Sequence, residues 1–169
     1  LKYLRPIELN DKKLDALKAL LKGNSYQLIE SALDFLLYKS PDRSKEWFEE
    51  VQEFKNLNKG GVGNHLYVSI LEKEALYKKS RKEDNLNKLV GLSSNKYEFR
   101  TRVNAFQAVG RMDFLNEELL INMEQALNSF NGRLSGPTRA VLNDYKKSNE
   151  KKLIIKSFCD SNEDSKVCD

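Results

Sequence analysis

Apolar residues in this chain recur at three- and four-residue steps, and residues that end helices interrupt them at intervals of about 15 to 20 residues. The spacing is clearest in one run of six: Leu28, Ile29, Ala32, Leu33, Leu36 and Leu37. Such a run gives an α-helix one wide apolar face. No segment of useful length alternates apolar and polar residues, as a half-buried strand does. The sequence therefore predicts an all-α protein of about nine helices, whose short loops favour antiparallel neighbours.

Capping residues predict where individual helices begin and end. Asn95, with Glu98 three residues later, has the spacing of a capping box, and Gly110 is expected to end the helix that follows. Ser135-Gly136-Pro137 predicts another helix start, because the missing N–H of proline is harmless in a first turn. These signals place the boundaries of the helices in the second half of the chain.

Two apolar stripes in the same half are expected to face a core. The first runs from Leu119 to Phe130 and is closed by Asn131-Gly132. The second belongs to a last helix capped at Ser148, and its predicted inward residues are Leu153, Ile154 and Phe158. Each stripe has the three- and four-residue spacing of a buried helix face.

A weak repeat suggests how the helices are organised. Ala32 and Ala105, each followed by a large apolar residue, lie 73 residues apart, about twice the 35 residues that separate Ala105 from Ala140. A period of roughly 35 to 40 residues is typical of helix-pair solenoids, in which stacked pairs share a core that one pair cannot form. The predicted architecture is a HEAT- or armadillo-like α-solenoid, with an irregular helical bundle as the alternative.

The composition predicts one helical-repeat domain over residues 1–158 and a polar C-terminal tail over 159–169. The chain begins without Met or an apolar signal core, so we expect a fragment of a longer protein or a processed form. Cys159 and Cys168 form either a disulfide or two unpaired thiols. A disulfide favours a secreted or periplasmic protein over a cytoplasmic one, and the compartment stays open.

The basic residues are candidates for an interaction surface. The net charge of +4 is too small to require nucleic acid or an anionic membrane. Helical repeats can nevertheless align basic side chains in a stripe, and the residues placed to do so are Arg100, Arg102, Arg133 and Arg139. Denser basic runs occur at 78–82 and 146–152, but Glu83 and Asp84 follow the first run and Glu150 interrupts the second. A solvated face is therefore favoured over a nucleic-acid interface.

The residue inventory contains no recognisable catalytic, cofactor or metal site. His65 is the chain's one histidine, so the paired histidines of a zinc peptidase cannot be present here. The glycine-rich turn at 60–64 lacks the preceding strand, the lysine and the hydroxyl of a phosphate-binding loop. No apolar stretch approaches the roughly 20 residues that span a bilayer. We therefore expect no catalytic residue, no cofactor, no metal and no membrane span.

The stretch KYEFRTRVNAFQAVG, residues 96–110, resembles the first helix of a HEAT-type repeat, in which an arginine precedes a small residue and a hydrophobic pair. Arg100 or Arg102, with Ala105 and Phe106, match those places. The stretch NGRLSGPTRAVLNDY, residues 131–145, resembles the start of a following repeat. The resemblance covers about 50 residues in total and implies a solenoid that binds other proteins by its shape.

The same C-terminal run resembles the α-helical end domain of aminopeptidase N-like zinc peptidases. In that family a helical solenoid closes over a separate catalytic domain. The resemblance implies a non-catalytic structural or protein-interaction module, the C-terminal part of a larger enzyme, whose partners are the other domains of that chain or a peptide segment. The alternative from another class is a nucleic-acid-binding helical repeat.

Overall fold

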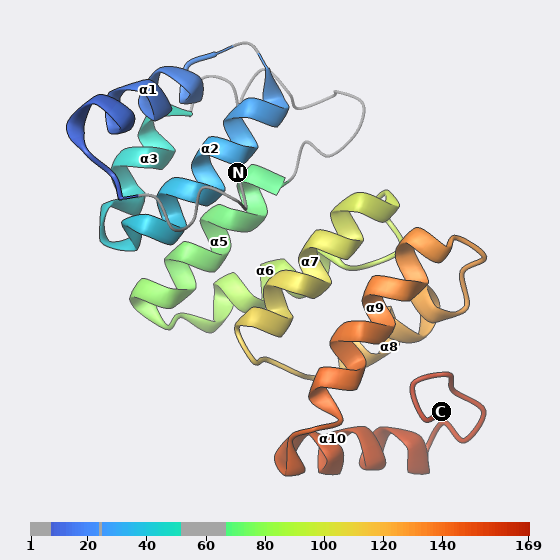
Figure 1. Cartoon of the computed structure of the whole chain (residues 1–169). Helices are drawn as coiled ribbons and strands as arrows, with labels where there is room; N and C mark the ends of the chain where they lie inside the picture. The colour runs from blue at the N-terminus through green and yellow to red at the C-terminus, as the bar shows by residue number, and fades with distance from the viewer. Residues whose placement is uncertain (1–7, 24, 52–66) are drawn as a thin grey trace. The chain divides into compact units, whose positions relative to one another are not determined.

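The computed structural model describes residues 8–23, 25–51 and 67–169 (Figure 1). Within those ranges the regular structure consists of nine α-helices and one short 3₁₀ helix, which confirms the predicted all-α class. The chain divides into two compact units, Leu1–Ala75 and Leu76–Asp169. The division falls within the stretch 1–158 that the sequence predicts to be one domain, and that single domain stays a prediction.

Among its described residues, the first unit holds three complete α-helices and the start of a further one. Their bounds are α1 Asp11–Leu21, α2 Tyr26–Lys39, η2 Pro41–Arg43, α3 Ser44–Glu50 and α5 Tyr67–Ser80. Asn10 caps α1, and its side chain accepts a 3.0 Å hydrogen bond from the N–H of Lys13. The boundary between the two units lies inside α5.

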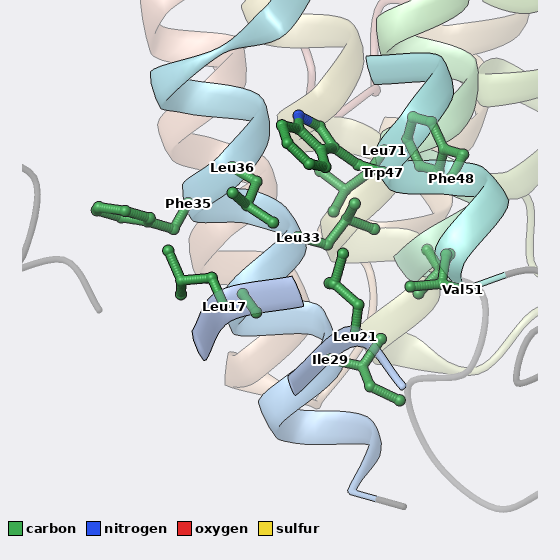
Figure 2. Packing of buried hydrophobic residues seen from close by; sticks show 12 residues of the cluster. Leu17, Leu21, Ile29, Leu33, Phe35, Leu36, Trp47, Phe48, Val51 and Leu71 are labelled. Carbon is green, nitrogen blue, oxygen red and sulfur yellow. The ribbon is translucent and has the colours of Figure 1, made fainter. Parts of the chain in front are cut away.

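An apolar cluster fills the space between α1, α2 and α3 (Figure 2). Leu33 and Leu36 of the predicted apolar face on α2 are fully buried, whereas Leu28 at the edge of that face is 51% exposed. Trp47 of α3 is also fully buried, and its indole N–H donates a 3.2 Å hydrogen bond to the carbonyl of Ser40. Each large apolar side chain buried in this way stabilises the unit by roughly 1.5–3 kcal/mol.

Charged side chains lie over the edge of this cluster. Arg43 places its guanidinium 4.5 Å from the centre of the Trp47 ring, and Lys18 lies 5.5 Å from the same centre. Both cations also contact Glu46, at 2.8 and 2.5 Å respectively. The hydrogen bond from Lys18, together with Arg43, holds the pKa of the Glu46 carboxyl below its ordinary value.

The second unit contains five further helices: α6 Glu83–Leu92, α7 Phe99–Arg111, α8 Glu117–Leu127, α9 Gly132–Tyr145 and α10 Asn149–Asp160. Here α6 packs against α7, and α8 packs against α9. Helix α7 in turn lies alongside α9, and α10 contacts α8 (Figure 1). Helices two places apart in the chain are thus neighbours in space.

Two predicted boundaries of α7 are wrong. Glu98, not Asn95, is the cap, because its carboxylate accepts hydrogen bonds from the N–H groups of Arg100 and Thr101 at 2.8 and 2.7 Å. The helix also continues through Gly110 to Arg111. The glycine serves packing instead, since a Cβ at this position would lie only 3.1 Å from a methyl carbon of Val141 on α9.

The predicted start of α9 is wrong as well. The helix begins at Gly132, where the side chain of Asn131 accepts a 3.0 Å hydrogen bond from the N–H of Arg133. Pro137 therefore lies inside the helix, where it cannot donate to the carbonyl one turn earlier. Asn131 is a stronger signal for a helix start than Pro137. Its side chain accepts a hydrogen bond from a free N–H group of the first turn, and a proline side chain has no acceptor with which to do this.

Two residues predicted to face a core are exposed. Phe130 follows the end of α8 at Leu127 and is fully exposed, because the helical spacing no longer applies in the loop. Leu153 is 69% exposed, since α10 turns Ile155 inward instead, together with Phe158, whose predicted burial is confirmed. The two inward residues lie three positions apart, which is one helical turn.

Candidate interaction surfaces

The four arginines predicted to form an interaction surface do not share one environment. Arg100, Arg133 and Arg139 are exposed, whereas Arg102 is only 7% exposed. A buried guanidinium cannot contact a partner, so the prediction is wrong for Arg102. The other three remain accessible, and no contact in the described part of the chain joins them into a stripe.

Arg102 organises a buried polar network between three helices. Its Nε donates to the carbonyl of Ser93 at 3.0 Å, and its Nη2 donates to the carbonyl of Asn122 at 3.3 Å. The Asn122 side chain donates to Ser93 Oγ at 3.0 Å and to the carbonyl of Val90 at 3.2 Å. Burial lowers the pKa of Arg102, although a guanidinium stays charged at neutral pH. The network connects α8 and α7 to the C-terminal end of α6.

The two dense basic runs also differ. The residues of the first run are all exposed: Lys78, Lys79, Arg81 and Lys82. In the second run, Lys147 pairs with Asp144 at 2.6 Å, and the nearly buried Lys151 pairs with Asp113 at 2.7 Å. Half of the second run therefore neutralises acidic residues of its own unit.

An open groove of about 400 Å³ lies along α7 and α9. Gly110 and Val141 line it, and a Cβ at Gly110 would lie 3.1 Å from Val141. Its remaining lining mixes polar and apolar side chains: Gln107, Arg111, Asp113, Pro137, Ala140, Asp144 and Tyr145. The sequence prediction missed this groove. The available signal was Gly110, an isolated glycine inside a helical pattern, which often marks close packing.

The turn after α7 is fastened to α9 and α10 at one end of this groove. Asp113 has a positive φ of 54°, a conformation that few side chains adopt, and its carboxylate pairs with Lys151. The Tyr145 hydroxyl donates a 2.7 Å hydrogen bond to the carbonyl of Phe114. Burial, and then the charge of Asp113, raise the pKa of Tyr145 well above its ordinary value. These contacts join the turn to α9 and α10 at that end of the groove.

The C-terminal segment folds back on the second unit. Cys159 and Cys168 are joined by a disulfide with a Cα–Cα distance of 5.8 Å. Val167 is completely buried, and the hydroxyl of Ser165 donates to the carboxylate of Glu124 on α8. The stretch 159–169, predicted to be a polar tail, is thus a closed loop with a buried anchor.

Some predicted features lie outside the described residues, including His65 and the glycine-rich turn at 60–64. In the described ranges, no group of three or more His, Cys, Asp or Glu side chains is placed to hold a metal ion. None of the described helices is both long and apolar enough to cross a membrane.

Comparison with known proteins does not identify a relative. No family model, no curated protein and no solved structure matches the chain.

Proposed function

We propose that the chain is a HEAT-like α-solenoid that acts as a non-catalytic protein-interaction module. The observation that carries the proposal is the packing of α7 on α9 within the second unit. Because α6 pairs with α7 and α8 with α9, this contact joins the second helices of successive pairs. The hydrogen bond from Asn122 on α8 to Val90 on α6 joins the first helices. Stacking of corresponding helices is the arrangement that a solenoid requires.

The groove along α7 and α9 is the proposed binding surface. Its volume suits a short peptide segment or a protruding side chain of a neighbouring domain. Gly110 and Val141 supply an apolar floor, and Gln107, Asp113 and Asp144 supply polar groups at the rim. An apolar floor with a polar rim is the usual composition of a protein-binding patch.

Site-specific photo-crosslinking tests this surface. A photoreactive residue replaces Gln107 or Ala140 in the groove, or the exposed Asn143 on α9 as a control outside it. If the groove is the binding surface, the same protein should be trapped from both groove positions and not from position 143. In the chain that carries the photoreactive residue at position 107, the further substitution Ala140→Arg should abolish trapping, because the long arginine side chain fills the groove. Equal trapping from Asn143, or none from the groove, overturns this groove as the binding surface.

Nucleic-acid binding is the second candidate, and one observation favours it. Residues 1–75 carry equal numbers of acidic and basic side chains, so the whole net charge of +4 belongs to residues 76–169. Titration of a single-stranded and a duplex oligonucleotide at increasing salt tests this alternative. Binding through several phosphates would weaken steeply with salt, as counterions compete for the basic side chains. Absence of binding at low salt would dismiss it.

The narrower proposal is that this module belongs to an aminopeptidase N-like zinc peptidase in a secreted or periplasmic setting. The Cys159–Cys168 disulfide supports the setting, because disulfides persist in oxidising compartments. The family assignment rests on the resemblance alone. An HExxH motif with a downstream glutamate, encoded in the same reading frame, would support it, and a complete frame without that motif would overturn it.

A further inference from the structure

A second groove lies beside the C-terminal disulfide. It has a volume of about 430 Å³ and is bordered by the end of α9, one face of α10 and the disulfide-closed loop. Three of its lining residues are lysines, namely Lys146, Lys152 and Lys156. Ile155 and the disulfide contribute apolar surface, and Asp169 contributes the one acidic side chain among the lining residues.

The three lysines lack the partners that their neighbours have. Lys147 pairs with Asp144, and Lys151 pairs with Asp113. Across the described ranges, no acidic side chain forms an ion pair with Lys146, Lys152 or Lys156, although Asp169 lines the same groove. Asp160, Glu163 and Asp164 of the loop are exposed and do not line it.

Two of the three lysines lie on one face of α10. Lys152 and Lys156 are four residues apart on α10, so their charges project from the same face. Like charges at that spacing destabilise a helix slightly, whereas a bound carboxylate between them would reverse the sign of the interaction. The groove therefore brings three lysines together with one acidic side chain, that of Asp169, so positive charge is in excess among its lining residues.

The disulfide-closed loop beside the lysines is anchored. The disulfide joins the end of α10 to the loop, and buried Val167 with the Ser165–Glu124 hydrogen bond anchors that loop on α8. Because the loop is anchored, a ligand need not order it when it binds, which lowers the entropic cost of binding.

We infer that this groove binds a segment rich in aspartate and glutamate on a partner protein. The inference rests on the proposed protein-interaction function and adds the chemistry of the segment that is recognised. Charge complementarity carries it, since three lysines without ion-pair partners surround a small, partly apolar hollow. Nucleic acid fits less well, because no aromatic side chain among the lining residues offers a stacking surface for a base.

Fluorescence anisotropy with a labelled peptide of alternating glutamate and glycine tests the inference on the full chain. The double variant Lys152→Gln/Lys156→Gln should raise the Kd about tenfold, since each exposed ion pair contributes up to about fivefold. The matched control Lys147→Gln removes a neighbouring lysine that already has a partner, and we expect less than about a twofold change. A peptide with glutamine in place of glutamate should not bind.

Three results would overturn the inference. They are equal binding of the glutamine peptide, an unchanged Kd for the double variant, and tighter binding of a single-stranded oligonucleotide that displaces the acidic peptide. All substituted lysines are exposed, so circular dichroism should show unchanged helicity. If the acidic peptide fails while crosslinking from Gln107 and Ala140 succeeds, the proposed function stands and only this inference falls. Failure of both experiments removes the proposed function as well.

Discussion

Each of the two units of the chain is stabilised internally by a different kind of contact. The first unit has a cluster of leucine, isoleucine, valine, phenylalanine and tryptophan side chains, with its ion pairs at the edge. The second unit also buries polar groups between helices, notably Arg102, Asn122, Thr138 and Lys151. Among the described residues of the first unit, the buried polar side chains are Ser44 and Glu74.

This difference shows which changes each unit can accept. An apolar cluster tolerates substitutions that preserve volume, because dispersion and burial do not depend on direction. A buried polar network depends on each donor meeting its acceptor, so the loss of one member leaves another unsatisfied. We therefore expect the first unit to be sensitive to side-chain size and the second to be sensitive to side-chain chemistry.

The largest effect is expected in the first unit, for Trp47→Ala. The substitution leaves a cavity in the apolar cluster and should lower the free energy of unfolding by about 3–5 kcal/mol. Urea denaturation followed by circular dichroism measures the loss. Leu28→Ala, at a half-exposed position on α2, is the control and should cost much less. Equal losses for the two variants would contradict the cluster as described.

The second prediction concerns Arg102→Ala, which should lower the free energy of unfolding by about 2–4 kcal/mol. The carbonyls of Ser93 and Asn122 would lose their donor while remaining buried. Arg102→Lys should restore little of this, because an ammonium lacks the planar fork that reaches both carbonyls. Arg100→Ala removes an exposed arginine two residues earlier and should be nearly neutral. Full rescue by lysine would show that charge matters here and geometry does not.

Third, the paired substitution Cys159→Ser/Cys168→Ser should cost about 2–3 kcal/mol, because a short covalent loop no longer restricts the unfolded chain. The free energy of unfolding of the wild-type chain should fall by a similar amount when a reductant is added, and its urea midpoint should fall with it. The midpoint of the serine variant should not respond to the reductant. A wild-type midpoint that is insensitive to complete reduction would show that the buried Val167 anchor is sufficient without the disulfide.

The smallest expected effect concerns Tyr145 and alkaline pH. Its pKa is raised in the folded state, so its contribution to stability is complete below about pH 10, the ordinary tyrosine pKa, and is lost as the pH rises above that value. The loss should approach 1.4 kcal/mol per pH unit. Tyr145→Phe should cost about 1 kcal/mol at neutral pH through the lost bond to Phe114 and should flatten the alkaline decline. An identical pH profile for the two proteins would contradict this assignment.

The sequence predicted the helices of the first unit better than the contacts of the second. Apolar spacing was sufficient for α2, because Leu33 and Leu36 lie on one continuous buried face. The apolar spacing predicted burial wrongly at two residues. Phe130 lies beyond the end of α8, and Leu153 is exposed because α10 turns another face inward. Periodicity identifies a stripe but does not say where along the stripe the neighbouring helix stops covering it.

The candidate surfaces were less predictable than the fold, because they depend on which residues meet across helices. Arg102 and Arg100 are both arginines on α7, yet one is buried and the other exposed. The same limit applies to the lysines: sequence alone does not show that Lys151 meets Asp113 while Lys152 has no such partner. Net charge and local density describe a run of basic residues, whereas pairing depends on the tertiary structure.

The close approach of α7 and α9 at Gly110 constrains how this protein can change during evolution. The glycine leaves space that a methyl group of Val141 already occupies. A homologue with a side chain at the position of Gly110 should therefore carry a smaller residue, such as alanine, at the position of Val141. The two positions should covary although they lie on different helices, and that pairing would help to recognise distant homologues whose overall sequence has diverged.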